Sequence, residues 1–169
     1  MKKSLLVLPL IAALFAVSAQ EIDLGTDQLQ GADLRSANLR GVYLRSAQLQ
    51  GANLSFAQLQ EADLSFAQLQ EADLRFAQLQ EADLTFAQLQ EADLTGALLS
   101  GADLTSAQLQ GAVLLEVRAV TASQIKRATN WRLAFYSWDV LADLNLPADH
   151  NEGVEKKLAE FEQEKTIMP

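Results

Sequence analysis

The sequence contains no cysteine and a single histidine, His150. Without cysteine the chain forms no disulfide, carries no lipoprotein anchor on a thiol and offers no thiolate to a metal. One histidine leaves no paired metal-ligand motif, and no glycine-rich phosphate-binding loop is present. His150 stands beside a predicted helix start, where a polar surface residue is ordinary. These absences predict a protein that is not an enzyme, with no catalytic residue, no cofactor and no metal site.

Basic residues are also scarce, because 13 lysines and arginines face 22 aspartates and glutamates and give a formal net charge of −9. Binding to nucleic-acid phosphates requires clustered lysine and arginine, so no nucleic-acid partner is expected. The excess of negative charge also keeps the protein soluble.

An apolar run from Leu5 to Val17 follows Lys2 and Lys3 and ends in the small residues Ser18 and Ala19. This arrangement is typical of a secretory signal peptide, here residues 1–19 with cleavage after Ala19. A membrane anchor is the alternative, but the run is short for a bilayer span. The prediction is a periplasmic or secreted protein with no membrane contact after cleavage. Loss of the two lysines would take the formal charge from −9 to −11.

A ten-residue phrase repeats through most of the chain and is clearest between Gly51 and Leu94. Each phrase consists of two five-residue units of alanine, a polar residue, leucine and two variable residues. On an α-helix, leucines at every fifth position scatter over all sides, and on a flat strand they alternate between the two faces. Neither element buries the leucines together, so the chain must bend once in each unit.

A chain that bends in each unit coils around a central axis. Alanine and leucine are two residues apart and point to the same side of a short extended segment, while the polar residue between them points outward. Successive coils then pair their backbone groups about 4.8 Å apart and form a solenoid, in which each turn packs on its neighbours. The predicted structural core includes Leu54, Leu59, Leu64, Leu69, Leu74, Leu79, Leu84 and Leu89.

The units resemble the pentapeptide-repeat family. The central leucines recur at every fifth position from Leu24 through Leu114, and the alanines two residues earlier run from Ala32 through Ala112 with only Val42 interrupting them. The resemblance implies an all-β solenoid, a right-handed quadrilateral β-helix of twenty residues per coil. The sequence alone favours an even number of faces but does not choose four. The predicted domains are the signal peptide (1–19), the β-helix (20–116, with an irregular first turn over 20–31) and a helical C-terminal cap and tail (117–169).

The cap is predicted from capping signals and apolar residues. Thr121 and Gln124 have the spacing of a capping box, which predicts a helix from Ala122 to Thr129. A second helix is predicted over Trp131–Leu144 with a break near Ser137, and a third over Asp149–Lys165. The third helix packs on its own cap or pairs with a second copy, which would give a homodimer through the C-terminal helices. The last coil is expected to be covered by Ile125, Ala128, Trp131, Leu133, Phe135 and Trp138.

Twenty-residue coils would align the outward residues in rows. The predicted rows are Asn53, Asp73 and Asp93; Asp63, Asp83 and Asp103 on the opposite face; Gln48, Gln68, Gln88 and Gln108; and the stacked pairs Phe56 over Phe76 and Phe66 over Phe86. Glutamine ladders and aspartate turns have structural roles. Calcium binding to the carboxylates is an alternative, but no loop gathers the six or more oxygens that calcium requires.

The sequence therefore predicts an exported structural or protein-binding scaffold whose partner is an unidentified protein. The candidate contact residues are Phe56, Phe66, Phe76 and Phe86, because exposed aromatic patches often bind proteins. The resemblance also implies an alternative, since some pentapeptide-repeat proteins mimic B-DNA, inhibit DNA gyrase and confer quinolone resistance. The acidic composition suits this alternative, whereas a signal peptide does not, because gyrase is cytoplasmic.

Overall fold

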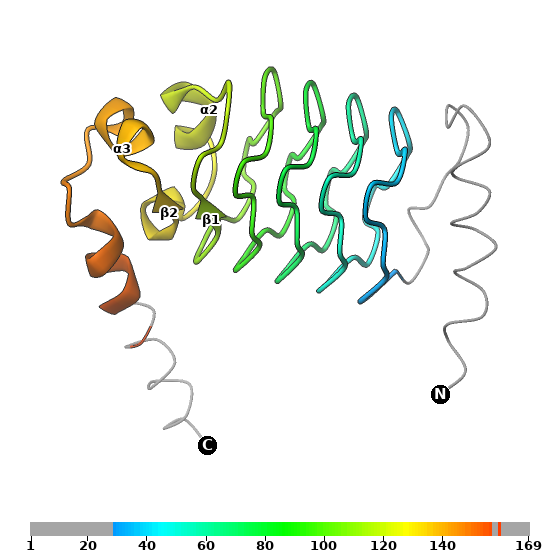
Figure 1. Cartoon of the computed structure of the whole chain (residues 1–169), viewed down its shortest axis with the longest axis horizontal. Helices are drawn as coiled ribbons and strands as arrows, with labels where there is room; N and C mark the ends of the chain where they lie inside the picture. Colours follow the sequence, from blue (N-terminus) through cyan, green and yellow to red (C-terminus); the bar gives the residue numbers. More distant parts are fainter. Residues whose placement is uncertain (1–28, 157–158, 160–169) are drawn as a thin grey trace.

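The computed structural model describes residues 29–156 and residue 159. The predicted signal peptide, the irregular units before Leu29, and Leu158 and Phe161 of the predicted third helix lie outside these residues. The described chain is a row of stacked coils with short helices gathered at its C-terminal end (Figure 1).

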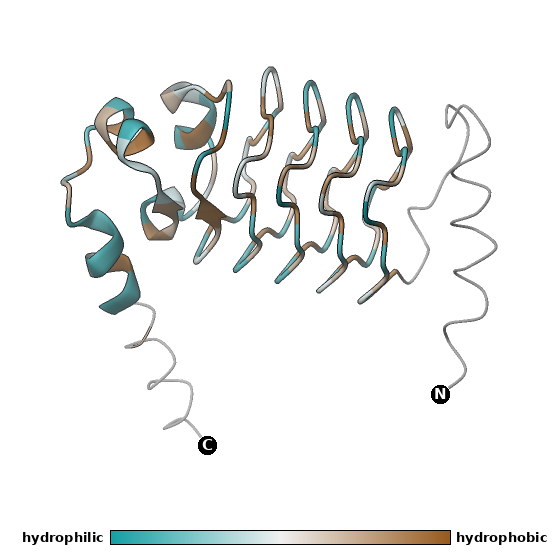
Figure 2. Ribbon diagram, viewed as in Figure 1, coloured by the Kyte–Doolittle hydropathy of each residue, from teal (hydrophilic) through white to brown (hydrophobic). Residues whose placement is uncertain are grey.

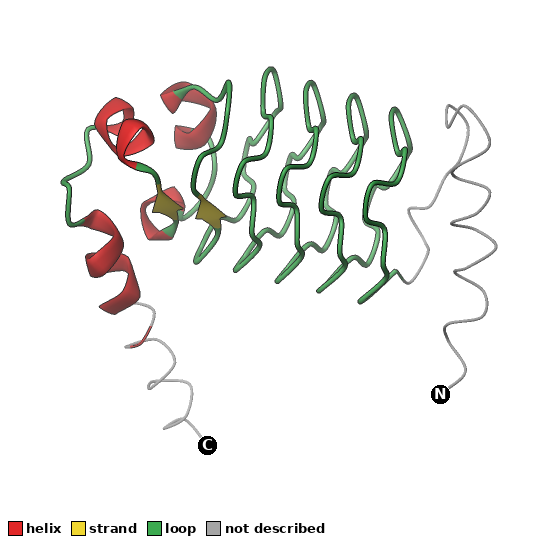
Figure 3. Ribbon diagram, in the orientation of Figure 1, coloured by secondary structure: helices red, strands yellow, loops and turns green. Residues whose placement is uncertain are grey.

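Each coil contains twenty residues. In the regular coils, parallel bridges join outward residues twenty positions apart, as in Asp33–Asn53, Gln48–Gln68 and Asp73–Asp93. The leucine of each unit donates its N–H to the next coil, as Leu54 does to Asp73 O at 2.7 Å, and the following alanine closes the bend, as Ala57 N–H does to Leu54 O at 3.0 Å. Four five-residue units therefore make one coil. The paired segments are single bridges, so Figure 3 draws the coils as loops.

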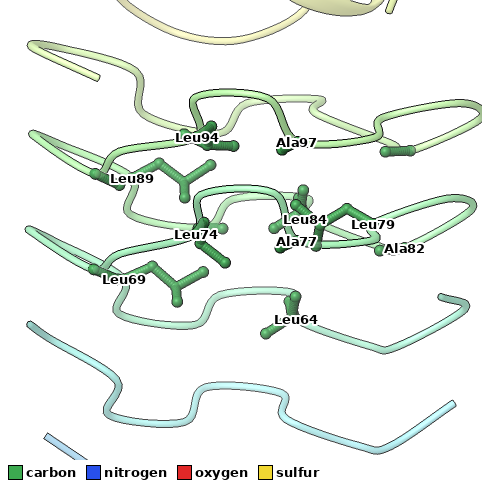
Figure 4. Packing of buried hydrophobic residues seen from close by; sticks show 14 of the residues in the cluster. Leu64, Leu69, Leu74, Ala77, Leu79, Ala82, Leu84, Leu89, Leu94 and Ala97 are labelled. Atoms are coloured by element: carbon green, nitrogen blue, oxygen red, sulfur yellow. The ribbon is translucent and has the colours of Figure 1, made fainter. Parts of the chain in front are cut away.

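The alanines and leucines line the inside of the coil. Leu54, Leu59, Leu64, Leu69, Leu74, Leu79, Leu84 and Leu89 are each 0% exposed. Figure 4 shows leucines of successive coils one above another, such as Leu74 and Leu94, with alanines such as Ala77 and Ala97 on the same inner surface. Apolar and polar residues alternate along each coil in Figure 2. Full burial stabilises the fold by roughly 1.5–3 kcal/mol per leucine, and the repetition makes this the main source of stability.

The bend needs a left-handed backbone at the last position of every unit. Glycine, which adopts it most easily, occurs there at Gly31, Gly41 and Gly51 with φ of 62–66°. Side-chain-bearing residues adopt the same conformation elsewhere, including Glu61, Glu71, Glu81 and Glu91 (φ 58–61°) and Phe56, Phe66, Phe76 and Phe86 (φ 58–60°). The corners of the coil thus display large side chains at a backbone angle that L-residues rarely adopt.

The parallel pairing continues beyond residue 116 into the cap. Arg118 pairs with Leu98, Thr129 with Gln108, and β2 (Phe135–Tyr136) with β1 (Val113–Leu114). The spacing between partners grows from twenty to 21 and then 22 residues because α2 (Ala122–Lys126) and the 3-10 helix η1 (Trp131–Leu133) interrupt the coil. The cap is therefore a distorted final turn of the same coil.

Three predictions about the cap are wrong in detail. The first helix begins at the predicted capping box but ends at Lys126 rather than Thr129, because Thr129 pairs with the preceding coil. The segment predicted as one interrupted helix contains η1, β2 and then α3 (Trp138–Leu144), with Ser137 as its N-cap at the predicted break. Trp138 does not cover the last coil, since it is 72% exposed.

Specific polar contacts attach the cap. The Gln124 amide donates to Leu99 O and Ala102 O, both at 3.0 Å. Asn151 accepts the N–H of Tyr136 and donates to its carbonyl, so a helical segment (150–156) is held against β2. Within the described ranges, no helix has the length and apolar character that crossing a bilayer requires.

Candidate functional site: faces and corners of the coil

The four sides of the coil form two chemically distinct pairs. The first acidic face carries Asn53, Asp73 and Asp93, and the second acidic face, on the opposite side, carries Asp63, Asp83 and Asp103. The remaining two sides are glutamine faces, with Gln58 and Gln78 on one and Gln48, Gln68, Gln88 and Gln108 on the other. The two acidic rows and the row of Gln48, Gln68, Gln88 and Gln108 are those predicted from the sequence, whereas the row of Gln58 and Gln78 is not among the predicted ones.

The aspartates fix the local bend. Each accepts the backbone N–H two residues later, as Asp83 does from Thr85 at 2.9 Å. Hydrogen bonds from the Arg35 side chain lower the pKa of Asp33, and those from Arg75 lower the pKa of Asp73. The Thr105 hydroxyl has the same effect on the pKa of Asp103. The aspartates of these rows therefore have a structural role at each bend.

The glutamines interact differently from the predicted ladder. Gln50 donates to Gln68, Gln60 to Gln78, Gln70 to Gln88 and Gln90 to Gln108. A corner glutamine thus bonds a face glutamine of the next coil, and glutamines twenty residues apart do not bond each other through their side chains. The long side chain reaches diagonally because the vertical neighbour is already joined by backbone bonds. Gln80 makes no such bond because Leu98 stands at the receiving position.

Two opposite corners carry glutamates and two carry phenylalanines. Glu61 and Glu81 occupy equivalent positions of successive coils at one glutamate corner, and Glu71 and Glu91 do so at the other. Arg40 forms an ion pair with Glu61. No group of three or more potential metal ligands is found among the residues that the structure describes.

The phenylalanines form two stacked pairs on opposite corners. Phe56 and Phe76 make the first aromatic corner, with ring centroids 5.1 Å apart and planes 16° apart. Phe66 and Phe86 make the second aromatic corner, with centroids 4.9 Å apart and planes 7° apart. The four rings are 41–55% exposed. The structure thus places the predicted contact residues in two separate strips.

Gly96 ends the first aromatic strip. It occupies the corner position one coil after Phe76, with φ of 71°. A Cβ atom at Gly96 would lie 2.5 Å from two carbons of the Phe76 ring. The ring therefore rests on bare backbone, and a side chain here would displace it.

Two exposed residues near the second aromatic corner were not among the predicted contacts. The Arg45 guanidinium lies over the Phe66 ring at 4.8 Å from its centroid and donates to Ser65 Oγ at 2.9 Å. Tyr43, on the second acidic face, is 52% exposed. The twenty-residue period predicts that Arg45 lies one coil before Ser65, but it does not predict the side-chain conformation that brings Arg45 over the Phe66 ring.

The only histidine serves the cap. His150 Nε2 lies 3.1 Å from Ala134 O, and its ring is 5.9 Å from that of Tyr136. The Tyr136 hydroxyl donates to Trp131 O at 2.6 Å, and burial raises the pKa of Tyr136 well above its usual range. These groups connect β2 to its neighbours, which is a structural role.

Comparison with known proteins identifies the repeat. The family model described as "Pentapeptide repeats" matches in 8 copies over residues 28–65, 47–85, 57–96 and 82–114. No curated protein matches at a significant level.

Several solved structures are similar. The pentapeptide repeat protein alr5209 from Nostoc PCC 7120 is 31% identical, with a TM-score of 0.51, covering 78% of this chain and 95% of its own. HetL, involved in heterocyst differentiation regulation in Nostoc sp. strain PCC 7120, is 30% identical over 60% of this chain, with a TM-score of 0.38. A pentapeptide repeat protein of the Arabidopsis thaliana thylakoid lumen is 30% identical, with a TM-score of 0.38, covering 57% of this chain and 70% of its own. The chain spans about half of HetL, 52% of its length.

Proposed function

Since the chain belongs to the pentapeptide-repeat family and has its right-handed quadrilateral β-helix fold, we propose that it is an exported, non-catalytic scaffold that binds another protein along its aromatic corners. Family members are in general scaffolds without catalysis. Fold alone does not define function, so the proposal depends on the chemistry of the surface.

One observation carries the proposal, namely four half-exposed phenylalanines at left-handed corners. Glycine and asparagine adopt this backbone at lower cost, and a bulky side chain costs roughly 1–2 kcal/mol there. Stacking returns about 0.5–1.5 kcal/mol for each pair, and the exposed half of each ring adds nothing to folding. Contiguous exposed aromatic surface is typical of protein-binding sites. Binding explains the choice of phenylalanine better than stability does.

Affinity capture from the cell envelope tests the binding site. The bait is the unchanged protein in the form found in the cell. It is compared with a variant in which Phe56, Phe66, Phe76 and Phe86 are all changed to serine. The matched control changes Glu61, Glu71, Glu81 and Glu91 to serine, at equivalent left-handed corners. We expect the phenylalanine variant to lose the partner and the glutamate variant to keep it. An unchanged partner list for the phenylalanine variant would refute the aromatic site.

Export is part of the proposal and is supported by the pattern of residues 1–19. We expect N-terminal sequencing of envelope protein to begin at Gln20. Recovery of the intact chain from Met1 would contradict cleavage. Accumulation in the cytoplasm, with inhibition of gyrase in a DNA-supercoiling assay, would favour DNA mimicry by the acidic coils instead.

A further inference from the structure

An open groove of about 700 Å³ lies on the first acidic face, beside the first aromatic corner. Its two ends are formed by Arg35 and Arg75, which belong to coils two apart, and Ser55 stands at the equivalent position of the coil between them. Ser55 is only 4% exposed and has a short side chain, so it forms the floor. Asn53 lines the groove on the side of the face, and Phe56 lines it on the side of the corner. The groove therefore exists because a serine separates two arginines.

The polar groups of the groove are mainly hydrogen-bond donors. Asn53 Oδ1 accepts both the N–H and the hydroxyl of Ser55, at 3.1 and 2.7 Å, which directs its Nδ2 group away from these bonds. Arg35 and Arg75 each bond the aspartate of their own coil through Nε and Nη2. Asn53 Nδ2 and both Nη1 groups donate to no residue that the structure describes. An amide NH₂ and a guanidinium donate and do not accept, so the groove suits a ligand that accepts.

Asn53 interrupts a row of aspartates, because Asp33 stands one coil before it and Asp73 one coil after it. The bend does not require asparagine, since Asp63 accepts the N–H of Ser65 at 2.9 Å in the same way. Asparagine differs from aspartate in that an NH₂ donor replaces one carboxylate oxygen and a negative charge is removed. A neutral donor thus stands where the row otherwise has an anion, at the centre of the groove.

From these contacts we propose that the groove binds a carboxylate of the partner protein, next to an apolar side chain that packs on Phe56. An ionised carboxylate only accepts hydrogen bonds, and its two oxygens suit a site with charged donors at both ends. Successive coils are about 4.8 Å apart, so the backbones of Arg35 and Arg75 are about 9.6 Å apart. A carboxylate that accepts one bond on each oxygen joins donors roughly 8 Å apart, so small movements of the two side chains suffice.

No net positive charge remains at the groove, which limits the affinity. Arg35 forms an ion pair with Asp33, and Arg75 forms one with Asp73, both at 2.7 Å. Asp93 adds a further negative charge 3.8 Å from Arg75 Nε. The carboxylate is therefore held by directed hydrogen bonds and by the aromatic contact rather than by net charge, and we expect weak binding.

The inference rests on the proposed function, because it states the chemistry of the partner at the first aromatic corner. The test is an NMR titration of the isolated protein, followed at the backbone amides of Ser55 and Phe56. The probe is N-acetylphenylalanine, which joins a carboxylate to an apolar side chain, and the control probe is its amide, which lacks the carboxylate. We expect saturable shifts with the first probe and at least about tenfold weaker binding of the second.

Substitution of Asn53 tests the donor at the centre of the groove. Asn53→Asp should weaken binding of N-acetylphenylalanine at least about tenfold, because it removes the Nδ2 donor and sets two carboxylates together. The matched control is Asn38→Asp, which makes the same change outside the groove, at a bend where Asn38 Oδ1 accepts the N–H of Arg40 at 3.3 Å. It should leave binding of the probe unchanged. Thermal melts verify that each variant is folded.

Several results would overturn the inference. Equal binding of the two probes would show that only the apolar group is recognised, and binding unaffected by Asn53→Asp would place the carboxylate elsewhere. The absence of saturable shifts up to roughly 50 mM probe would show that the groove binds no carboxylate.

Affinity capture separates this inference from the proposed function. We expect Asn53→Asp to reduce capture of the partner and Asn38→Asp to leave it unchanged. If the four-phenylalanine variant loses the partner but Asn53→Asp keeps it fully, the proposed function stands and the role of the groove is wrong. If the groove binds the carboxylate probe but the four-phenylalanine variant keeps every partner, the proposed function is wrong and the carboxylate specificity of the groove stands.

Discussion

The coils and the cap are held together by different kinds of contact. In the coils the same contact recurs in every unit, and each coil packs only on its neighbours. In the cap each contact is made once: Gln124 reaches two carbonyls of the last coils, Tyr136 bonds Trp131, and Asn151 bonds β2. The comparison shows that the coils depend on repetition, whereas the cap depends on individual side chains.

The largest expected effect is a charge inside the coil. Leu74→Asp should prevent folding, with a loss of at least about 5 kcal/mol, because an unpaired carboxylate would be buried among leucines. In the cap, Trp138→Asp should change the stability by about 0.5 kcal/mol or less, because Trp138 is 72% exposed. Circular dichroism melts measure both. A cooperative, native-like melt of the Leu74 variant would contradict the core.

Loss of a single cap side chain should have the next largest effect. Tyr136→Ala should cost about 3–5 kcal/mol and open the cap, exposing the last coil to aggregation. Hydrogen exchange should show faster exchange of the cap amides than of the amides around Leu59. Tyr136→Phe is the control, which removes one hydrogen bond and should cost about 1 kcal/mol. Equal acceleration in both regions would mean that the coils and cap unfold as one unit.

Gly96 should tolerate a side chain less well than the glycines at other corners of the coil. Gly96→Ala should cost about 2–4 kcal/mol, from backbone strain and the clash with Phe76. Gly51→Ala should cost only about 1 kcal/mol, because its Cβ would meet nothing within 4 Å. In a chain that already carries Phe76→Ser, Gly96→Ala should lower the free energy of unfolding by only as much as Gly51→Ala does in the unchanged protein. Denaturant titration measures these differences, and equal losses at both glycines would refute the ring contact.

The smallest expected effects are those of pH on stability, which differ between the coils and the cap. The lowered pKa of Asp73 stabilises the coils above the unfolded value of about 3.9, and this contribution is lost as pH falls through the folded pKa. It should be below about 1 kcal/mol because the Arg75 pair is partly exposed. The raised pKa of Tyr136 stabilises the cap below about pH 10, and this is lost as pH rises further.

Melting temperatures across pH measure both effects. Asp73→Asn should flatten the acid limb and Tyr136→Phe the alkaline limb. A variant that flattens the opposite limb would contradict the assignment.

Predictability from sequence follows the same division. A five-residue period sets the coil, because leucines at that spacing are buried together only if the chain bends in each unit. The rows of Asp73 and Asp93 and the stacking of Phe66 on Phe86 follow from the twenty-residue register. The diagonal bond from Gln50 to Gln68 does not, because it depends on the conformation of a long side chain.

The cap was less predictable for physical reasons. The capping box gave the start of α2, because Thr121 and Gln124 are local partners. Its end was missed because Thr129 pairs with a residue of the previous coil, which tertiary contacts decide. The sequence predicts helix over β2 for the same reason, since Phe135 and Tyr136 form a strand only against Val113 and Leu114.

The ten-residue phrase has a consequence for how such a chain can change length. Two opposite sides of the coil are chemically alike, so gaining or losing ten residues rotates the remainder by half a turn and still sets aspartate over aspartate and phenylalanine over phenylalanine. A change of five residues would instead set acidic sides over glutamine sides. We therefore expect the fold to tolerate insertions and deletions in steps of ten residues, which would change the length of the solenoid but not the chemistry of its faces.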